Sequence, residues 1–204
     1  RYSKEEIAEM AGEMEKASEK MFKLIAKFLD VNLIESGKRN FKSVKFNAAD
    51  VVNQVVTLNK NHAESKNIGI SLNCKDELEI YSDADSLGQI LDNLVSNAVK
   101  FTLPDKNISI NAFLKDDIIR FEVKDEGPGL TESDKQKLFG RFKRLSAQPT
   151  GNEISTGLGL SIAQKLTVIL GGKIWCESET GNGATFIIEI PAGKFPDTEE
   201  LQNS

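Results

Sequence analysis

The chain has 204 residues, of which 39% are hydrophobic and 28% charged. This composition predicts a folded protein of one full domain with an extension, or of two small domains. The net charge of −5 argues against nucleic-acid binding, and no apolar run approaches the roughly 18 residues that span a bilayer, so we expect no direct membrane contact. The two cysteines, Cys74 and Cys176, lie in apolar strand-like runs, which favours reduced thiols in a cytoplasmic protein over a disulfide.

The N-terminal stretch predicts one long helix with a narrow apolar seam. Apolar residues recur every three or four positions over about three heptads, at Ile7, Met10, Met14, Ala17, Met21, Leu24 and Phe28. A lone helix cannot bury such a seam, so we expect a bundle with a partner helix or a second chain, in preference to packing on its own domain. The run Ser36-Gly37-Lys38 is expected to end this helix.

From Phe41 the pattern changes to mixed helices and strands. Strands are expected at 44–46, 68–72, 78–81, 108–114, 118–123, 173–177 and 184–190. Helices are expected at 49–63, after Ser82 with Asp83 as the cap, and at 156–170. A long polar, basic segment covers about 131–155, and a short acidic tail follows Pro191.

The central helix after Ser82 carries an unusual polar face. Asn93 and Asn97 lie one turn apart, and Lys100 and Phe101 follow one turn later, so all four share a face opposite the apolar residues. Asparagine is a poor helix former. Its repetition at this spacing indicates either a binding surface or a surface helix that happens to carry two amides.

Two glycine clusters offer further binding chemistry. Asp125 ends a strand and leads into Gly127 and Gly129, so its carboxylate can accept a hydrogen bond from an exocyclic amine while the glycines let a flat ring approach the backbone. A capped turn is the alternative. The run Thr156-Gly-Leu-Gly-Leu160 opens a helix, and exposed amides at a helix N-terminus favour phosphate.

Together these motifs make the chain similar to the ATP-binding domain of sensor histidine kinases, in the superfamily that includes gyrase B and the mismatch-repair ATPases. Five motifs occur in the family's order within residues 41–191. They are the N box at 93–102, the glycine boxes at 125–129, 156–160 and 181–186, and the F box at 138–144. The end of the N-terminal helix also resembles the second helix of the family's dimerisation and phosphoacceptor hairpin.

The resemblance implies a role for each residue of the N box. Asn97 would give a carbonyl oxygen to Mg²⁺, whose other ligands are phosphate oxygens and water, and Asn93 would complete that face through water. Lys100 would face the phosphates of ATP, and Phe101 would lie against the adenine.

It also assigns the glycine boxes and the F box. Asp125, with Gly127 and Gly129, would take the adenine amino group, assisted by Thr185 through water. The second glycine box would hold the phosphates, through Thr156, Gly157, Leu158, Gly159 and Leu160. Residues 130–156 would form a lid with Phe139 and Phe142 as apolar anchors and Arg144 as its phosphate-reaching cation.

The fold implied is a two-layer α/β (α+β) sandwich, with a mixed β-sheet packed on three main helices and one long bundle-forming helix before it. We expect residues 1–40 to be part of the hairpin, 41–191 the catalytic domain, and 192–204 a disordered tail or linker. The function implied is transfer of the γ-phosphoryl group of ATP, bound with Mg²⁺, to a histidine outside this chain. Asn93, Lys100 and Arg144 would be the catalytic residues, and a response-regulator aspartate would receive the group next.

The parent protein is expected to form a homodimer through the N-terminal helix and to bind a response-regulator receiver domain. We expect it to be cytoplasmic, with anchoring in the inner membrane left open. The only histidine, His62, follows the apolar face of the helix at 49–63, and we expect it to be an ordinary surface histidine.

Two other functions fit parts of the pattern. A non-catalytic ATP-binding regulatory module is disfavoured by the complete set of Asn97, Asp125 and glycines. An ATP hydrolase of the gyrase type is disfavoured by Asn93, because hydrolysis there needs a carboxylate base and an amide cannot accept the proton.

Overall fold

The computed structural model describes residues 2–75, 77–143, 145–151 and 156–193. The chain divides into two compact units, Arg1–Arg39 and Asn40–Ser204. The acidic tail after Pro191 lies almost wholly outside the described residues. Within the described part, no helix has the length and apolar character that crossing a membrane requires.

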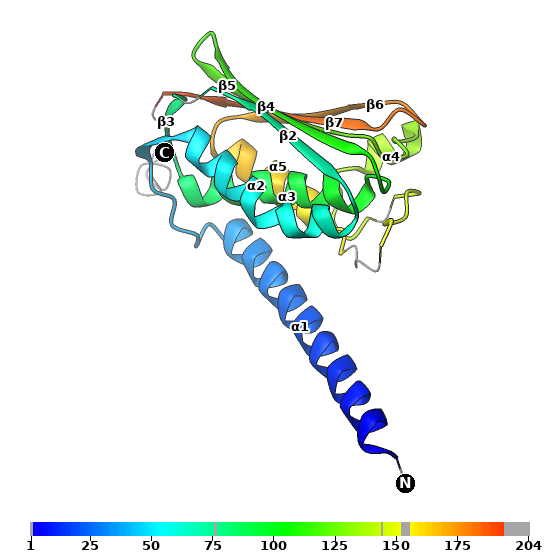
Figure 1. Ribbon diagram of the computed structural model, residues 1–204. Helices are drawn as coiled ribbons and strands as arrows, with labels where there is room; N and C mark the ends of the chain where they lie inside the picture. Colours follow the sequence, from blue (N-terminus) through cyan, green and yellow to red (C-terminus); the bar gives the residue numbers. More distant parts are fainter. Residues whose placement is uncertain (1, 76, 144, 152–155, 194–204) are drawn as a thin grey trace. The chain divides into compact units, whose positions relative to one another are not determined.

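The first unit is the helix α1, Lys4–Glu35, shown in Figure 1. Ser3 and Glu6 form a capping box at its start, in which each side chain accepts a hydrogen bond from the other residue's backbone amide. The helix ends where predicted, because Gly37 adopts a φ of 64° and the next amides return to the last turn. Its apolar seam is exposed, with Met14 70% and Met21 62% accessible.

The second unit is built on a five-stranded mixed sheet with the order β2-β4-β5-β7-β6. Its strands are β2 (Gly69–Cys74), β4 (Asn107–Lys115), β5 (Ile118–Asp125), β6 (Lys173–Ser178) and β7 (Ala184–Pro191). Only β2 and β4 pair in parallel, and the other pairs are antiparallel. A separate two-stranded sheet pairs β1 (Val44–Asn47) with β3 (Glu79–Ser82).

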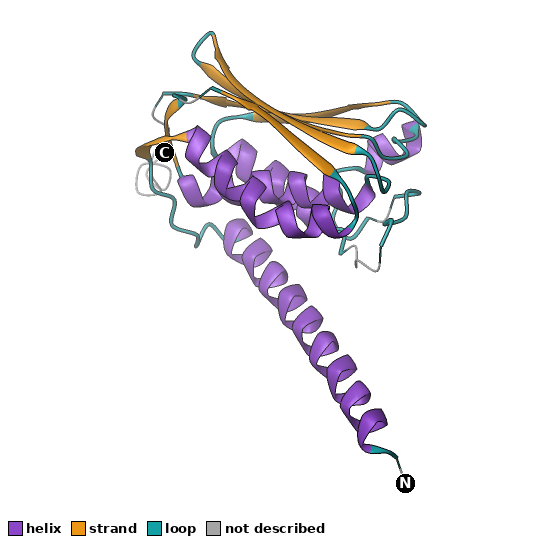
Figure 2. Ribbon diagram, in the orientation of Figure 1, coloured by secondary structure: helices purple, strands orange, loops and turns teal. Residues whose placement is uncertain are grey.

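Helices cover one face of the five-stranded sheet (Figure 2). They are α2 (Ala48–Ser65), α3 (Ala84–Phe101) and α5 (Gly159–Ile169), and the short α4 (Glu132–Lys137) lies near the ends of β6 and β7. The core lies between the two layers, where the apolar stripe of α3 meets alternate residues of β4, β5 and β7. The predicted two-layer sandwich is therefore confirmed.

Asp83 fixes the start of the central helix α3. One carboxylate oxygen accepts the amide hydrogen of Ser86 at 2.8 Å, and the other accepts that of Lys42 at 2.9 Å. The same side chain therefore caps α3 and holds residue 42, which is 41 positions earlier in the chain. The predicted cap is confirmed, and Asp83 is only 8% exposed.

We expect Asp83→Ala to lower the free energy of unfolding of the second unit by about 2 kcal/mol. The cap of α3 and the hydrogen-bond acceptor of the Lys42 amide are lost together. Asp85→Ala, in the first turn of the same helix, is the matched control and should cost below about 0.5 kcal/mol. Urea unfolding followed by circular dichroism measures both. Equal losses in the two variants would show that the Asp83 contacts contribute nothing specific.

Two elements differ from the predictions. Helix α5 begins at Gly159 instead of residue 156, because Gly157 has a φ of 67° and cannot belong to a right-handed helix. Helix α4 was not predicted, although Thr131 and Asp134 carry its capping-box spacing in the sequence.

Candidate functional site

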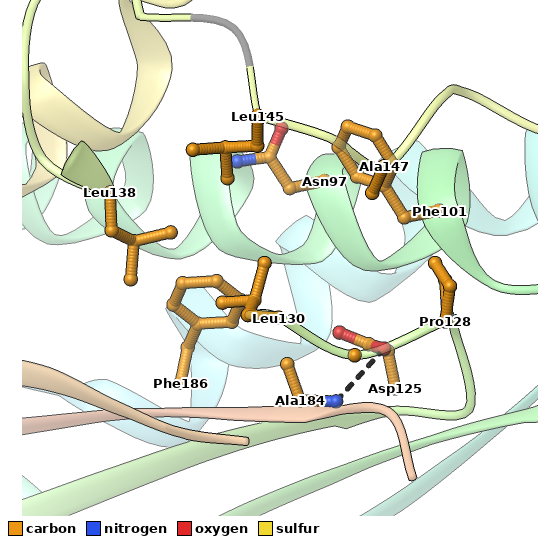
Figure 3. A pocket seen from close by; sticks show the side chains of 11 residues that line it. Asn97, Phe101, Asp125, Pro128, Leu130, Leu138, Leu145, Ala147, Ala184 and Phe186 are labelled. Atoms are coloured by element: carbon orange, nitrogen blue, oxygen red, sulfur yellow. Dashed lines mark hydrogen bonds between the residues drawn. The ribbon is translucent and has the colours of Figure 1, made fainter. Parts of the chain in front are cut away.

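A pocket opens between α3, the ends of β5 and β7, and the segment that follows β5 (Figure 3). Most of its lining is apolar, and only Asn97 and Asp125 bring polar side chains. The lining residues are Asn97, Phe101, Asp125, Pro128, Gly129, Leu130, Leu138, Leu145, Ala147, Ala184 and Phe186. An apolar pocket with a few convergent polar groups is the usual form of a small-molecule site.

Asp125 stands at the sheet end of this pocket and is 5% exposed. One carboxylate oxygen, Oδ1, accepts hydrogen bonds from the amides of Gly127 at 2.9 Å and Ala184 at 3.2 Å. The other oxygen accepts none from the described residues. Burial raises the pKa of Asp125 above its usual value, although the two backbone hydrogen bonds oppose this shift. The second oxygen is thus a buried acceptor that a ligand amine can satisfy.

Glycines make the close backbone packing around Asp125 possible. A Cβ on Gly183 would lie 2.0 Å from the carbonyl oxygen of Asp125, and one on Gly127 would lie 2.9 Å from that of Phe101. A Cβ on Gly129 would lie 2.0 Å from the carbonyl oxygen of Glu179. Two of these glycines, Gly129 and Gly183, also have positive φ angles, of 69° and 72°, where other residues are strained.

The two asparagines of α3 are in different states. Asn97 lines the pocket, is half-buried, and has no hydrogen-bond partner among the described residues. Asn93 is 5% exposed, and its side-chain amide nitrogen donates to the carbonyl of Gln89 at 2.9 Å. The side-chain oxygen of Asn93 faces the start of α5. A Cβ on Gly159 would lie 2.8 Å from that oxygen. The structure therefore brings Asn93 and the second glycine box together.

The remaining residues of the N box lie at the end of α3. Phe101 is half-buried and lines the pocket, and Lys100 is 8% exposed, with its ammonium nitrogen 5.6 Å from the centre of the Phe101 ring. Arg144, predicted as the cation of the lid, lies outside the described residues.

The second glycine box packs against the F box. Gly157 accepts a hydrogen bond from the amide of Phe142 at 2.9 Å, and a Cβ on Gly157 would lie 2.8 Å from the carbonyl oxygen of Lys143. Thr156 accepts a weaker bond from the amide of Leu158 at 3.3 Å. The first turn of α5, which includes Leu160, has no side-chain cap, so its amides are open to an anionic group.

Two predicted site residues are not where the sequence placed them. Thr185 does not line the pocket, because side chains of a strand alternate and Ala184 and Phe186 are the ones that point into it. Phe142 is 63% exposed and is not an apolar anchor, since the backbone turns there with a φ of 54°. Leu130 and Leu138 are the apolar residues that are buried between residues 130 and 143.

Sequence reasoning missed the apolar half of the pocket. The sequence held a signal for each of four residues in this half. Ala184 and Phe186 alternate along a predicted strand, Leu130 directly follows the first glycine box, and Leu138 is the first residue of the F box. Sequence reasoning also missed Asp134, whose role depends on a contact 12 positions away in the chain.

The fold is a two-layer α/β domain whose pocket is lined by residues of α3, β5 and β7. Residues 82–194 match the family described as histidine kinase-, DNA gyrase B-, and HSP90-like ATPase. The chain belongs to this family, as the motifs in its sequence predicted.

Relatives and solved structures place the chain near the sensor histidine kinases. It is 33% identical over 178 residues to the circadian input-output histidine kinase CikA of Synechococcus elongatus, a match that covers 86% of this chain and 24% of CikA. The histidine kinase ThkA in complex with the response regulator TrrA is 26% identical, with a TM-score of 0.73, over 94% of this chain and 53% of ThkA. Full-length ShkA in complex with AMPPNP shares the fold, with a TM-score of 0.82 at 24% identity, over 97% of this chain and 41% of ShkA. The chain spans about a quarter or less of the length of the curated relatives it matches.

Proposed function

We propose that this chain binds ATP together with Mg²⁺ and transfers the γ-phosphoryl group to a histidine outside residues 1–204. The observation that carries the proposal is the buried carboxylate of Asp125, whose second oxygen has no partner in the described chain and lies in an otherwise apolar pocket. Adenine presents a flat apolar ring with an amino group at one edge, whereas guanine presents a carbonyl there. Asp125 can therefore accept from adenine and repel guanine.

Asn97 is the residue that we propose for the metal. The described residues contain no group of three or more His, Cys, Asp or Glu side chains that could hold an ion. The side chain of Asn97 has no hydrogen-bond partner among the described residues. A neutral amide oxygen suits Mg²⁺, which takes most of its ligands from phosphate and water. When bound, Mg²⁺ would neutralise charge on the phosphate oxygens.

The other residues would position the phosphates. We propose that Asn93, Lys100 and the amides of the first turn of α5, from Gly159 on, form the phosphate side of the site, since Asn93 and Gly159 lie close together. Arg144 keeps its proposed role as a cation during transfer. Asn93 also supports transfer over hydrolysis, because an amide cannot take a proton from water.

The partners of the parent protein follow from the same proposal. The exposed seam of α1 supports a homodimer, and the division of the chain between residues 39 and 40 supports a hairpin helix followed by a catalytic domain. ThkA was solved with a response regulator, and we propose that a receiver domain of this kind accepts the phosphoryl group in this system too.

We expect Asn97→Ala to abolish most of the tightening of ATP binding by Mg²⁺, while ATP without metal still binds through its adenine. Asn61→Ala, an exposed asparagine on α2, is the control and should behave as the starting protein. Calorimetric titration with and without Mg²⁺ measures both. If Mg²⁺ tightened binding in Asn97→Ala as much as before, Asn97 would not be the ligand.

A labelling experiment tests the transfer. We expect the chain to bind ATP yet not to label itself with radioactive phosphate, because His62 is exposed in the last turn of α2, away from the Asp125 pocket, and an acceptor must lie in line with the γ-phosphate. Adding a helix that bears the phosphoacceptor histidine should restore labelling. Strong labelling of the chain that disappears in His62→Gln would contradict the proposal.

A further inference from the structure

Residues 145–147 lie at the pocket, and Leu145 and Ala147 are both part of its lining (Figure 3). Ser146, between them, is turned toward α4. Its hydroxyl donates to Oδ2 of Asp134 at 2.5 Å and its amide donates to Oδ1 at 2.9 Å. The Asp134 carboxylate therefore holds both the backbone and the side chain of Ser146, which lies between Leu145 and Ala147.

Asp134 is built to hold this contact. It is 6% exposed and also accepts from the hydroxyl of Thr131 at 2.7 Å and from its amide at 3.3 Å. The Ser146 and Thr131 hydrogen bonds lower the pKa of Asp134 to about 2, so it is ionised at neutral pH. Hydrogen bonds to an ionised acceptor are the stronger kind.

A second attachment follows a few residues later. The amide and hydroxyl of Thr150 both donate to the carbonyl of Lys100 at 3.1 Å, and the hydroxyl also donates to that of Thr102 at 2.9 Å. Residues 145–150 are thus tied at one end to α4 and at the other to the end of α3. Leu145 and Ala147 are held over the pocket between these two points.

Little room is left in the pocket beneath Leu145 and Ala147. The cavity measures about 40 Å³, far below the roughly 300–1,000 Å³ typical of small-molecule sites. Leu145 and Ala147 both line this space, so we expect them to move aside before an adenine ring can reach Asp125.

We infer that Asp134 is a positioning residue that holds residues 145–147 in the nucleotide pocket of the unliganded chain, so that an adenine nucleotide binds only after the Asp134–Ser146 contact opens. The inference rests on the proposed function for the identity of the ligand. The apparent dissociation constant is then the intrinsic one divided by the fraction of chains with an open contact. Weakening the contact raises that fraction and tightens binding.

Ser146→Ala is the first test, because it removes one bond to Asp134 and leaves the cap of α4 intact. We expect ATP to bind it about three- to tenfold more tightly, measured by calorimetry with Mg²⁺ present. Ser133→Ala is the matched control, since its hydroxyl is on α4 and, within the described part of the chain, takes a hydrogen bond from Lys137 alone. It should leave the affinity unchanged. Unchanged or weaker binding to Ser146→Ala would overturn the inference.

Leu145→Ala gives an independent readout, since it shortens an occluding side chain without touching the contact. It should also tighten ATP binding, whereas weaker binding would show that Leu145 contacts the bound nucleotide and would overturn the inference. Hydrogen exchange of residues 145–147 without nucleotide tests the contact alone. Faster exchange in Ser146→Ala than in Ser133→Ala is expected, and equal exchange would contradict the contact.

The two proposals can fail separately. If no variant binds ATP, the proposed function fails, and exchange at residues 145–147 still decides the contact. If all variants bind ATP equally, the function stands and the occlusion is wrong.

Discussion

Replacing Gly183 by alanine is expected to lower the free energy of unfolding of the second unit by about 3 kcal/mol or more and to abolish nucleotide binding. The added Cβ would lie 2.0 Å from the carbonyl oxygen of Asp125, a backbone atom in a paired strand that cannot move aside easily. The residue also has a φ of 72°, which costs a residue with a side chain about 1–2 kcal/mol. Strand β7 and Asp125 must shift together, and the pocket shifts with them.

Gly181→Ala is the control for the backbone strain alone. Gly181 has a φ of 90°, yet a Cβ there would meet no atom within 4 Å. It should cost only about 1–2 kcal/mol and should keep ATP binding. Chemical denaturation and calorimetry measure the two effects, and equal behaviour of the two variants would mean that the close approach to Asp125 is not a constraint.

Asp125→Asn is expected to weaken ATP binding by about one to two decades. A hydrogen bond to a charged acceptor is worth roughly 1.5–3 kcal/mol, and an asparagine amide at that position would place a donor against the donor of adenine. The fold should keep its stability within about 1 kcal/mol. Burial raises the pKa of Asp125, so the ionised carboxylate costs folding free energy at neutral pH, and the neutral isostere is relieved of this cost.

Glu126→Gln, the adjacent position, removes the same charge while its side chain can still accept from the amide of Asn107. It controls for long-range electrostatics and should leave ATP affinity within about twofold, because an exposed charge is screened. If Asp125→Asn and Glu126→Gln lowered affinity equally, net charge and not adenine recognition would be the cause.

Features that depend on residues close together in the chain could be predicted from the sequence. The cap at Asp83 and the face shared by Asn97 and Phe101 depend on residues a turn apart. The start of α5 was predicted three residues early, because only the backbone conformation of Gly157 reveals that the helix has not yet begun.

Contacts between distant segments could not be predicted in this way. The family resemblance implied a water-mediated role for Thr185, whereas the pairing of β7 puts Ala184 and Phe186 on the pocket side of the strand. The spacing of Thr131 and Asp134 in the sequence fits a capping box but gives no sign of a contact with Ser146. The bonds of Asp134 to Ser146, and the closure of the pocket that they hold, appear only when the chain is folded.

The most direct test of the site is a titration of the isotope-labelled chain with ATP·Mg²⁺ and, separately, with GTP·Mg²⁺, followed by the amide resonances. We expect ATP to bind saturably and to shift the amides of Gly127, Asn97 and Ala184, which surround Asp125 or line its pocket. GTP at the same concentration should leave them unmoved. Equal shifts with GTP, or ATP shifts confined to residues away from the Asp125 pocket, would contradict the account.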